Sequence, residues 1–352
     1  MNRSYYLQLA RSGLRMPIGA DLVLHERQDP EAILLDPARL AEVVVAAARS
    51  FGTPLAIPHM DLQLEKTALL SILGVPESDA PKYHLSAKLS PVATARFEDG
   101  LEERLHPKLR AHNSSVWHVG KEPDVLPIGM SIGPFSLMSK LLVDPIMPVA
   151  MAGSGLTAKD DEDISLLEQA LDLSTRFVLR TLRDQLEAGA RAVFIAEPAA
   201  NKVYLSPRQI AAGSDIFERY VMLPNQRIKG LLDEFDADLF FHCCGELVDS
   251  MIESFGRLDP AILSLGSSRN LWEDARLVSD QTVLYGNLPS KRFYADDNIT
   301  VDEVERMAIE LLAKMEATGH PFILGTECDV LSVPGCHDII CKKVRAFMCA
   351  EA

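Results

Sequence analysis

Short apolar runs alternate along the whole chain with longer segments that have helical periodicity. The apolar runs fall at residues 16–19, 55–58, 126–132, 192–195, 238–242, 262–265, 282–285 and 321–324. Within them, apolar and polar residues do not alternate strictly, which is typical of strands buried on both faces of a parallel sheet. Polar or glycine residues and then a helical segment follow each run. The pattern therefore predicts repeated β–α units.

Several helices can be placed from their first residues. Asp36-Pro37 and Ser206-Pro207 each put a capping side chain before a proline, which suits the first turn of a helix. Residues 161–188 and 300–315 are long and periodic. With no break in composition, eight β–α units predict a single α/β domain over residues 1–352, a closed (β/α)8 TIM barrel. A doubly wound open sheet is the alternative, but no glycine-rich phosphate loop follows the first strand.

Two segments exceed what a minimal barrel needs, and we expect insertions after the second and third strands. Residues 78–125 are polar, interrupted by prolines, and contain four histidines. Residues 144–162 contain two prolines and two glycines, which predicts a loop. Segments of this length often form lids or binding elements.

Composition narrows the function classes. The 352 residues carry a net charge of −15, which disfavours a nucleic-acid partner. No apolar run is long enough to span a membrane, and the first residues do not resemble a secretory signal. All six cysteines lie in the C-terminal third of the chain. We therefore expect a cytoplasmic protein with reduced thiols, in which cysteines are core residues or metal ligands.

In a TIM barrel, the active site forms at the carboxyl ends of the strands. His242 and Cys244 end the fifth predicted strand and should project to the same side, with Cys243 pointing the opposite way. Cys328 ends the eighth strand. One imidazole and two thiolates suit Zn²⁺ and leave one position open, where a substrate thiol could bind and ionise. The alternative is that these cysteines are inert core residues, which is also our expectation for Cys336, Cys341 and Cys349.

Other polar residues at the strand ends are candidates for the same site. Glu197 is predicted to be catalytic, as a further metal ligand or a partner that orients His242, with a helix-capping or solvated carboxylate as the alternative. A lone histidine after a strand is more often a satisfied polar residue than a ligand, and this applies to His59. The candidates for binding substrate or cofactor are Asp21, His59, Asp61, Asn287 and Glu327.

Several strings resemble the uroporphyrinogen decarboxylase superfamily over about residues 15–350. They are residues 130–137 (MSIGPFSL), 197–200 (EPAA), 205–207 (LSP) through Tyr220, 242–245 (HCCG) and 286–288 (GNL). Decarboxylases of this superfamily carry an arginine-rich string after the first strand. Here that stretch reads MPIGADL, with Asp21 and no arginine. The His-x-Cys pair with a distant cysteine is instead similar to the zinc signature of the cobalamin-dependent methyltransferases, such as the methylcobalamin:coenzyme M methyltransferases.

The resemblance implies a barrel fold and zinc-dependent methyl transfer from a methylated corrinoid to a thiol or similar small acceptor, such as coenzyme M or tetrahydrofolate. An Asp-x-His-x-x-Gly corrinoid-binding run is absent, so methylcobalamin would arrive free or on a separate corrinoid protein. Barrels of this kind often pair, so a homodimer is among the expectations. Residues 333–338 (VPGCHD) depart from the Thr-Pro-x-Glu-Asn-like string of the family, which leaves the acceptor open. The alternatives are a metal-free decarboxylase and a non-catalytic partner of a corrinoid protein.

Overall fold

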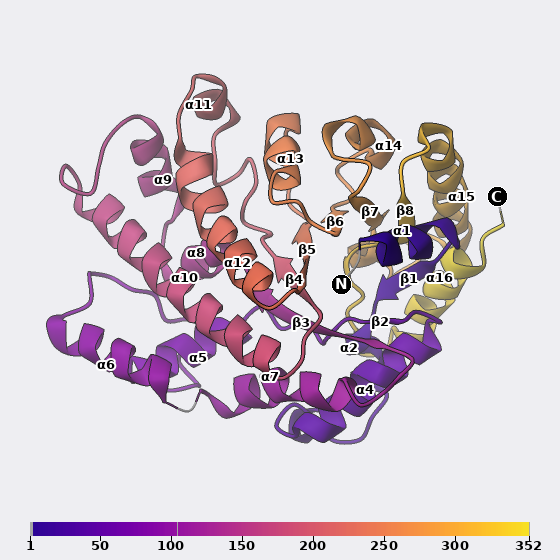
Figure 1. The fold of residues 1–352 in the computed structure, drawn as a ribbon, viewed down its shortest axis with the longest axis horizontal. Helices are drawn as coiled ribbons and strands as arrows, with labels where there is room; N and C mark the ends of the chain where they lie inside the picture. Colours follow the sequence, from indigo (N-terminus) through magenta and orange to yellow (C-terminus); the bar gives the residue numbers. More distant parts are fainter. Residues whose placement is uncertain (1–2, 104, 352) are drawn as a thin grey trace.

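The computed structural model describes residues 3–103 and 105–351, and each predicted apolar run overlaps a strand of one parallel sheet. The strands are β1 (Arg15–Ile18), β2 (Leu55–Ala56), β3 (Leu126–Ile132), β4 (Ala192–Ala196), β5 (Asp238–Cys243), β6 (Ile262–Leu265), β7 (Val283–Leu288) and β8 (Phe322–Asp329). Their order in the sheet is β1-β8-β7-β6-β5-β4-β3-β2, the order of strands around a (β/α)8 barrel (Figure 1). The α/β class and the TIM-like architecture are therefore confirmed.

The predicted closed ring of hydrogen bonds is wrong. β1 and β2 lie at the two ends of the sheet, and no ladder joins them within the described residues. Pro17 in β1 and Pro58 after β2 have no N–H to donate, and β2 has only two residues. Side chains bridge the gap instead: Thr53 Oγ1 lies 3.1 Å from Met16 Sδ, and Met16 and Leu55 share one apolar cluster. The sheet is thus curled but open in its hydrogen bonding.

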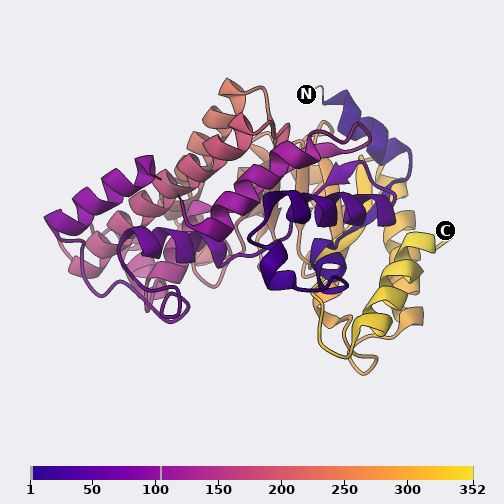
Figure 2. The same cartoon turned by 90° about the horizontal axis from the view of Figure 1, so that it is seen from below.

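Helices follow the strands in chain order and surround the curled sheet (Figures 1 and 2). The helices before β3 are α1 (Ser4–Arg11), α2 (Ala20–His25), α3 (Pro30–Ile33), α4 (Pro37–Ser50), α5 (Leu64–Ile72), α6 (Pro91–Glu102) and α7 (Pro107–Val119). Between β3 and β5 lie α8 (Pro134–Leu141), α9 (Ile146–Gly153), α10 (Glu162–Glu187), α11 (Pro207–Ala211), the π-helical turn η1 (Glu218–Met222) and α12 (Leu223–Glu234). The rest are α13 (Asp249–Gly256), α14 (Leu271–Asp274), the 3₁₀ turns η2 (Ala275–Leu277) and η3 (Ser290–Arg292), α15 (Val301–Thr318) and α16 (His337–Cys349).

The predicted helix starts are confirmed by their caps. The Asp36 carboxylate accepts hydrogen bonds from the first turn of α4, and Asp161 does the same for α10. Thr300 and Glu303 form a reciprocal capping box at the start of α15. Ser206 also caps α11, but α11 ends at Ala211 and Gly213 follows with a φ of 90°. The helix that begins after Ser206 is therefore short and ends well before α12.

The two predicted insertions contain helices. Residues 78–125 include α6 and α7, and α7 packs against α4, α10 and β3 as part of the helical layer. Residues 144–162 include α9, so the prediction of a loop there is wrong. Asp144 Oδ1 accepts hydrogen bonds from the N–H groups of Ile146 and Met147. Pro148 lies in the first turn of α9, where a helix needs no N–H donor, so this proline is tolerated.

The two largest apolar clusters of the described residues lie on the two faces of the sheet. One fills the interior of the curled sheet and includes Met16, Ile128, Phe194, Phe240 and Tyr285. The other lies between the sheet and its helices and is larger. Within the described ranges, no helix is long and apolar enough to cross a bilayer. The carboxyl ends of the strands all face one side of this framework, and the predicted site residues lie there.

Candidate metal centre

Strand β5 and the residue after it place His242 and Cys244 on the inner side of the sheet. The imidazole of His242 lies against the ring of Phe194, with ring centroids 5.4 Å apart. Cys243 points the other way, is fully buried in the outer core, and its Sγ lies 3.7 Å from the carbonyl oxygen of Ala200. The predicted alternation of these side chains is therefore confirmed.

Cys328, near the end of β8, completes a group of three potential ligands. One ligand atom from each of His242, Cys244 and Cys328 lies within 4.8 Å of the other two. Zinc–ligand bonds of about 2.0–2.3 Å place neighbouring ligand atoms about 3.3–3.8 Å apart in a tetrahedral site. The arrangement is thus close to what a single ion needs, although these residues are far apart in the sequence.

The hydrogen bonds of His242 fit the role of a ligand. Its Nδ1 lies 2.8 Å from Ser264 Oγ, on the neighbouring strand β6, where Ser264 pairs in register with His242. Its Nε2 is buried and has no hydrogen-bond partner among the described residues. When Nδ1–H donates to Ser264, the lone pair on Nε2 is free for a metal ion. An unpartnered imidazole nitrogen beside two thiols is the donor set that Zn²⁺ prefers, so the residues fit the ion.

The two thiols of this group have different pKa values. The hydrogen bond with Cys328 lowers the pKa of Cys244, and His242 and the positive charge of Lys291 act in the same direction. The same hydrogen bond raises the pKa of Cys328. Burial lowers the pKa of Lys291, but the negative charge at Cys244, Cys328 and Glu327 outweighs this effect and raises it. Lys291, in η3 after β7, is a member of the site that the sequence analysis missed.

Glu197, at the end of β4, binds the first turn of α8. Its Oε1 accepts hydrogen bonds from the backbone N–H of Phe135 and the amide of Asn225, and its Oε2 accepts one from the N–H of Ser136. A Cβ atom on Gly133 would lie 2.1 Å from Glu197 Cδ, so the glycine makes room for this contact. Burial raises the pKa of Glu197. These contacts favour the helix-capping alternative.

Asp21 and His59 form a hydrogen-bonded pair at the ends of β1 and β2. Asp21 Oδ1 lies 3.1 Å from His59 Nε2, and Asp21 Oδ2 accepts a 2.6 Å hydrogen bond from the N–H of Ser332. Burial alone would raise the pKa of Asp21, but these two hydrogen bonds lower it. Burial alone would lower the pKa of His59, whereas the hydrogen bond to Asp21 and the charges of Asp329 and Asp61 raise it. His59 thus has a hydrogen-bond partner, as expected of a lone histidine.

The remaining candidates hold loops at the rim of the sheet. Asp61 Oδ1 accepts a hydrogen bond from the N–H of Gln63, ahead of α5. Asn287 donates from Nδ2 to the carbonyl oxygens of Gly266 and Arg269. Glu327 Oε2 accepts hydrogen bonds from the N–H and the hydroxyl of Ser267. Asn287 and Glu327 therefore fix the loop after β6, on the side of the sheet that carries Cys328.

Asp329 is a further buried group that the sequence analysis did not select. Neither of its carboxylate oxygens has a hydrogen-bond partner among the described residues, and the residue is 4% exposed. Burial raises the pKa of Asp329 to about 7, while nearby His59 acts against this shift. The signal in the sequence was its position directly after Cys328, at the end of a buried strand.

His112, in α7, gives a prediction for stability. Burial lowers its pKa from 6.5 to about 4, and the charge of His59 adds to this effect. The unfolded chain therefore binds a proton at a higher pH than the folded protein does. Between pH 7 and pH 4, this residue should destabilise the fold by about 3 kcal/mol. Urea unfolding of the wild type and His112→Asn at both pH values checks this: the stability advantage of the wild type should shrink by that amount on acidification, and a pH-independent difference would contradict the assignment.

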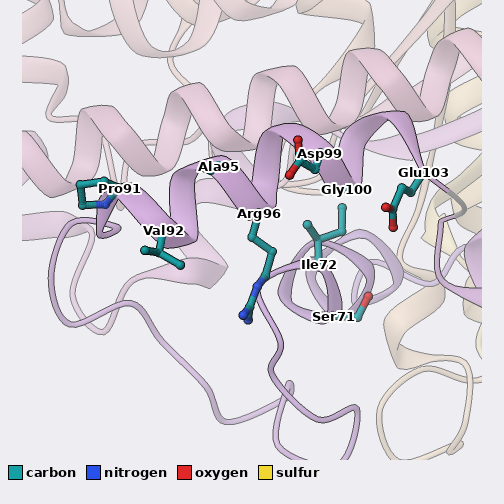
Figure 3. A pocket seen from close by; sticks show the side chains of 9 residues that line it. All are labelled: Ser71, Ile72, Pro91, Val92, Ala95, Arg96, Asp99, Gly100 and Glu103. Atoms are coloured by element: carbon teal, nitrogen blue, oxygen red, sulfur yellow. The ribbon is translucent and has the colours of Figure 1, made fainter.

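A groove of about 770 Å³ lies away from these residues, between α6 and the end of α5 (Figure 3). A Cβ on Gly100 of α6 would lie 2.3 Å from Ile72 Cγ2, so the glycine allows the two helices to approach. Arg96 and Asp99 project from α6 at its edge. None of the predicted site residues lines this groove, and the chemistry is concentrated at the strand ends instead.

A curled parallel sheet of eight strands with a nitrogen and two sulfur donors at its carboxyl ends defines a TIM-like protein with a candidate soft-metal centre. Residues 23–345 match the family model described as Uroporphyrinogen decarboxylase (URO-D). The chain therefore belongs to the uroporphyrinogen decarboxylase family, as the sequence strings predicted.

One curated relative and one solved structure, both named as methyltransferases, are similar to this chain. The methylcobamide:CoM methyltransferase MtaA of Methanosarcina barkeri is 26% identical over 170 residues, which are 48% of this chain and 44% of that protein. The alignment thus spans less than half of the relative. The solved structure of a methyltransferase from Methanosarcina mazei covers 99% of this chain and 98% of its own, with a TM-score of 0.65 and 18% identity, which shows the shared fold. Within the family, the similarity is to the methyltransferase branch, as predicted.

Proposed function

We propose that this protein is a zinc-dependent methyltransferase that moves a methyl group from a methylated corrinoid to a thiol or a similar small acceptor. The observation that carries the proposal is the convergence of the His242, Cys244 and Cys328 donor atoms, with Nε2 of His242 buried and unpartnered. The relatives named as methyltransferases support the same reaction class. For a thiol acceptor, one S–C bond forms, the Co–C bond of the donor breaks with its electron pair left on cobalt, and the thiol proton goes to solvent.

The chain's own residues would prepare the site in three ways. His242, Cys244 and Cys328 would hold the ion, and Ser264 would fix the orientation and tautomer of the imidazole through Nδ1. Zn²⁺ bound there would lower the pKa of an acceptor thiol, so that a thiolate is available near neutral pH. Lys291 would add a positive charge beside the two cysteine sulfurs and offset part of their negative charge.

Residues around the rim would position the substrates. We assign Asn287 and Glu327 to the shape of the loop after β6, because their hydrogen bonds end there. Asp21, His59 and Asp61 form a charged cluster after β1 and β2, beside Asp329 at the end of β8. We assign this cluster to contacts with the acceptor or with the edge of the corrinoid. The corrinoid would arrive free, as methylcobalamin, or on a separate protein.

The assay that tests this proposal follows the corrinoid itself. The zinc-loaded protein, mixed with methylcobalamin and a panel of thiols, should demethylate the corrinoid with at least one thiol and yield its methyl thioether. Spectroscopy of the corrinoid and mass spectrometry of the thiol measure the two products. A protein that leaves methylcobalamin intact with every acceptor, yet releases CO₂ from a carboxylated tetrapyrrole without metal, would be a decarboxylase instead. Corrinoid-protein binding without any turnover would indicate the non-catalytic partner.

A further inference from the structure

A second group of potential ligands lies between the ends of two helices, outside the site described above. Glu26 follows the last residue of α2, and His337 and Cys341 lie one turn apart at the start of α16. One ligand atom from each lies within 4.8 Å of the other two. His337 Nε2 is the shared atom: it lies 3.0 Å from Glu26 Oε1 and 3.3 Å from Cys341 Sγ.

No single tautomer of His337 can donate to Glu26 and accept from Cys341 at the same time. If Nε2 carries a proton, it can donate to Glu26, but it then has no lone pair to accept a hydrogen bond from the Cys341 thiol. If Nε2 carries a lone pair, it can accept from Cys341, but it then faces the oxygen of Glu26 with no proton between them. A divalent cation in the same position would be bound by all three atoms at once.

We propose that Glu26, His337 and Cys341 form a second metal site, which binds a divalent cation of the zinc type. A carboxylate oxygen, an imidazole nitrogen and a thiolate sulfur are all ligands of Zn²⁺, and the sulfur disfavours Mg²⁺ and Ca²⁺. The partial exposure of the three residues leaves room for water to complete the coordination. Asp338 and Arg345 add one negative and one positive charge near Cys341.

The position of this site suggests what it does for the protein. The segment between β8 and α16 connects the strand that contains Cys328 to the last helix. In this segment, the N–H of Ser332 donates a hydrogen bond to Asp21 of α2. A cation held by Glu26 and α16 would be a second link between this segment and α2. It would therefore stabilise the connection after Cys328 without contributing a ligand to the first centre. This role does not depend on the proposed methyl transfer.

Zinc titration of metal-free protein against a chromophoric chelator tests the site. Wild type should bind one equivalent more than His337→Ala or Cys341→Ser, and Cys349→Ser should match wild type. Cys349 is the matched control because it is an exposed cysteine on the same helix. The difference between wild type and Cys341→Ser is the readout, so it remains valid even if the first centre binds no metal. Equal zinc binding by wild type and Cys341→Ser would overturn the proposal.

Alkylation of unsubstituted protein provides a measurement that does not depend on whether a variant folds. One equivalent of zinc beyond that needed for the first centre should slow the alkylation of Cys341 at least tenfold, as measured by peptide mass spectrometry. The exposed Cys349 should react at the same rate with and without zinc. Equal alkylation rates for Cys341 under both conditions would also overturn the proposal.

Discussion

Replacement of Cys328 by serine should remove the metal of the first centre and lower methyl transfer by more than about 100-fold. Changes in residues that only support metal ligands already cost about 10- to 100-fold in metal affinity or activity, and a lost ligand should cost more. Cys328 is one of only three described residues whose donor atoms meet at this position. Metal analysis of the purified variant and the methylcobalamin assay give the two measurements.

Two further variants calibrate this expectation. Ser264→Ala leaves all three ligands in place and removes only the partner of His242 Nδ1, so its loss should lie between wild type and Cys328→Ser. Cys349→Ser changes an exposed cysteine far along α16 and should retain metal and activity. If Cys328→Ser kept full activity while folded, the cysteine would be a core residue and the metal centre would be wrong.

Replacement of Glu197 by alanine should destabilise the fold by about 3 kcal/mol or more. The backbone N–H groups of Phe135 and Ser136 would lose their acceptor in a fully buried place, and the side-chain amide of Asn225 would keep only its hydrogen bond to Val221. Each buried group left without a partner costs about 1–3 kcal/mol. Urea unfolding measures this loss. Glu246→Ala is the matched control, because Glu246 is an exposed carboxylate paired with Lys202, and such a pair contributes about 0–1 kcal/mol.

The conservative variant Glu197→Gln separates the capping role from a catalytic one. Glutamine keeps one acceptor oxygen, so part of the stability should return relative to Glu197→Ala. The turnover rate per folded molecule should remain close to that of wild type, because both carboxylate oxygens point at α8 and Asn225. A stable Glu197→Gln protein with a strongly reduced turnover rate would instead assign Glu197 to the reaction.

The strand pattern was predictable because a strand buried on both faces must be apolar along its length. Each of the runs from 16–19 to 321–324 overlaps an observed strand, and the caps at Asp36, Asp161 and Thr300 fixed helix starts. The gap in hydrogen bonding between β1 and β2 depends on Pro17 and Pro58, which have no N–H group, and on the shortness of β2. Helices α6 and α7 were missed because their segment is polar and interrupted by prolines, and α9 was missed because the prolines and glycines around it predicted a loop. Packing against other elements stabilises α7, and local capping stabilises α9.

Two residues of the site could be predicted because they lie at the end of one strand. His242 and Cys244 follow from the two-residue period of β5, and Ser264 would have followed from pairing β5 with β6 in register. Lys291 acts through a charge that only folding brings to the site, which a linear sequence does not show, whereas Asp329 could have been found from its position directly after Cys328. Cys341 was expected to be a core residue, because the approach of Glu26 from α2 depends on how distant segments fold together.

X-ray absorption of the zinc-loaded protein is the most direct test of the first centre. The measurement should use Cys341→Ser, so that the second proposed site does not contribute to the spectrum. We expect about one zinc per chain, with two sulfur neighbours at about 2.3 Å and nitrogen or oxygen neighbours at about 2.0–2.1 Å. The sulfur count should fall to one in the double variant that also carries Cys244→Ser. A folded protein that binds no zinc, or zinc with only oxygen and nitrogen neighbours, would contradict the account.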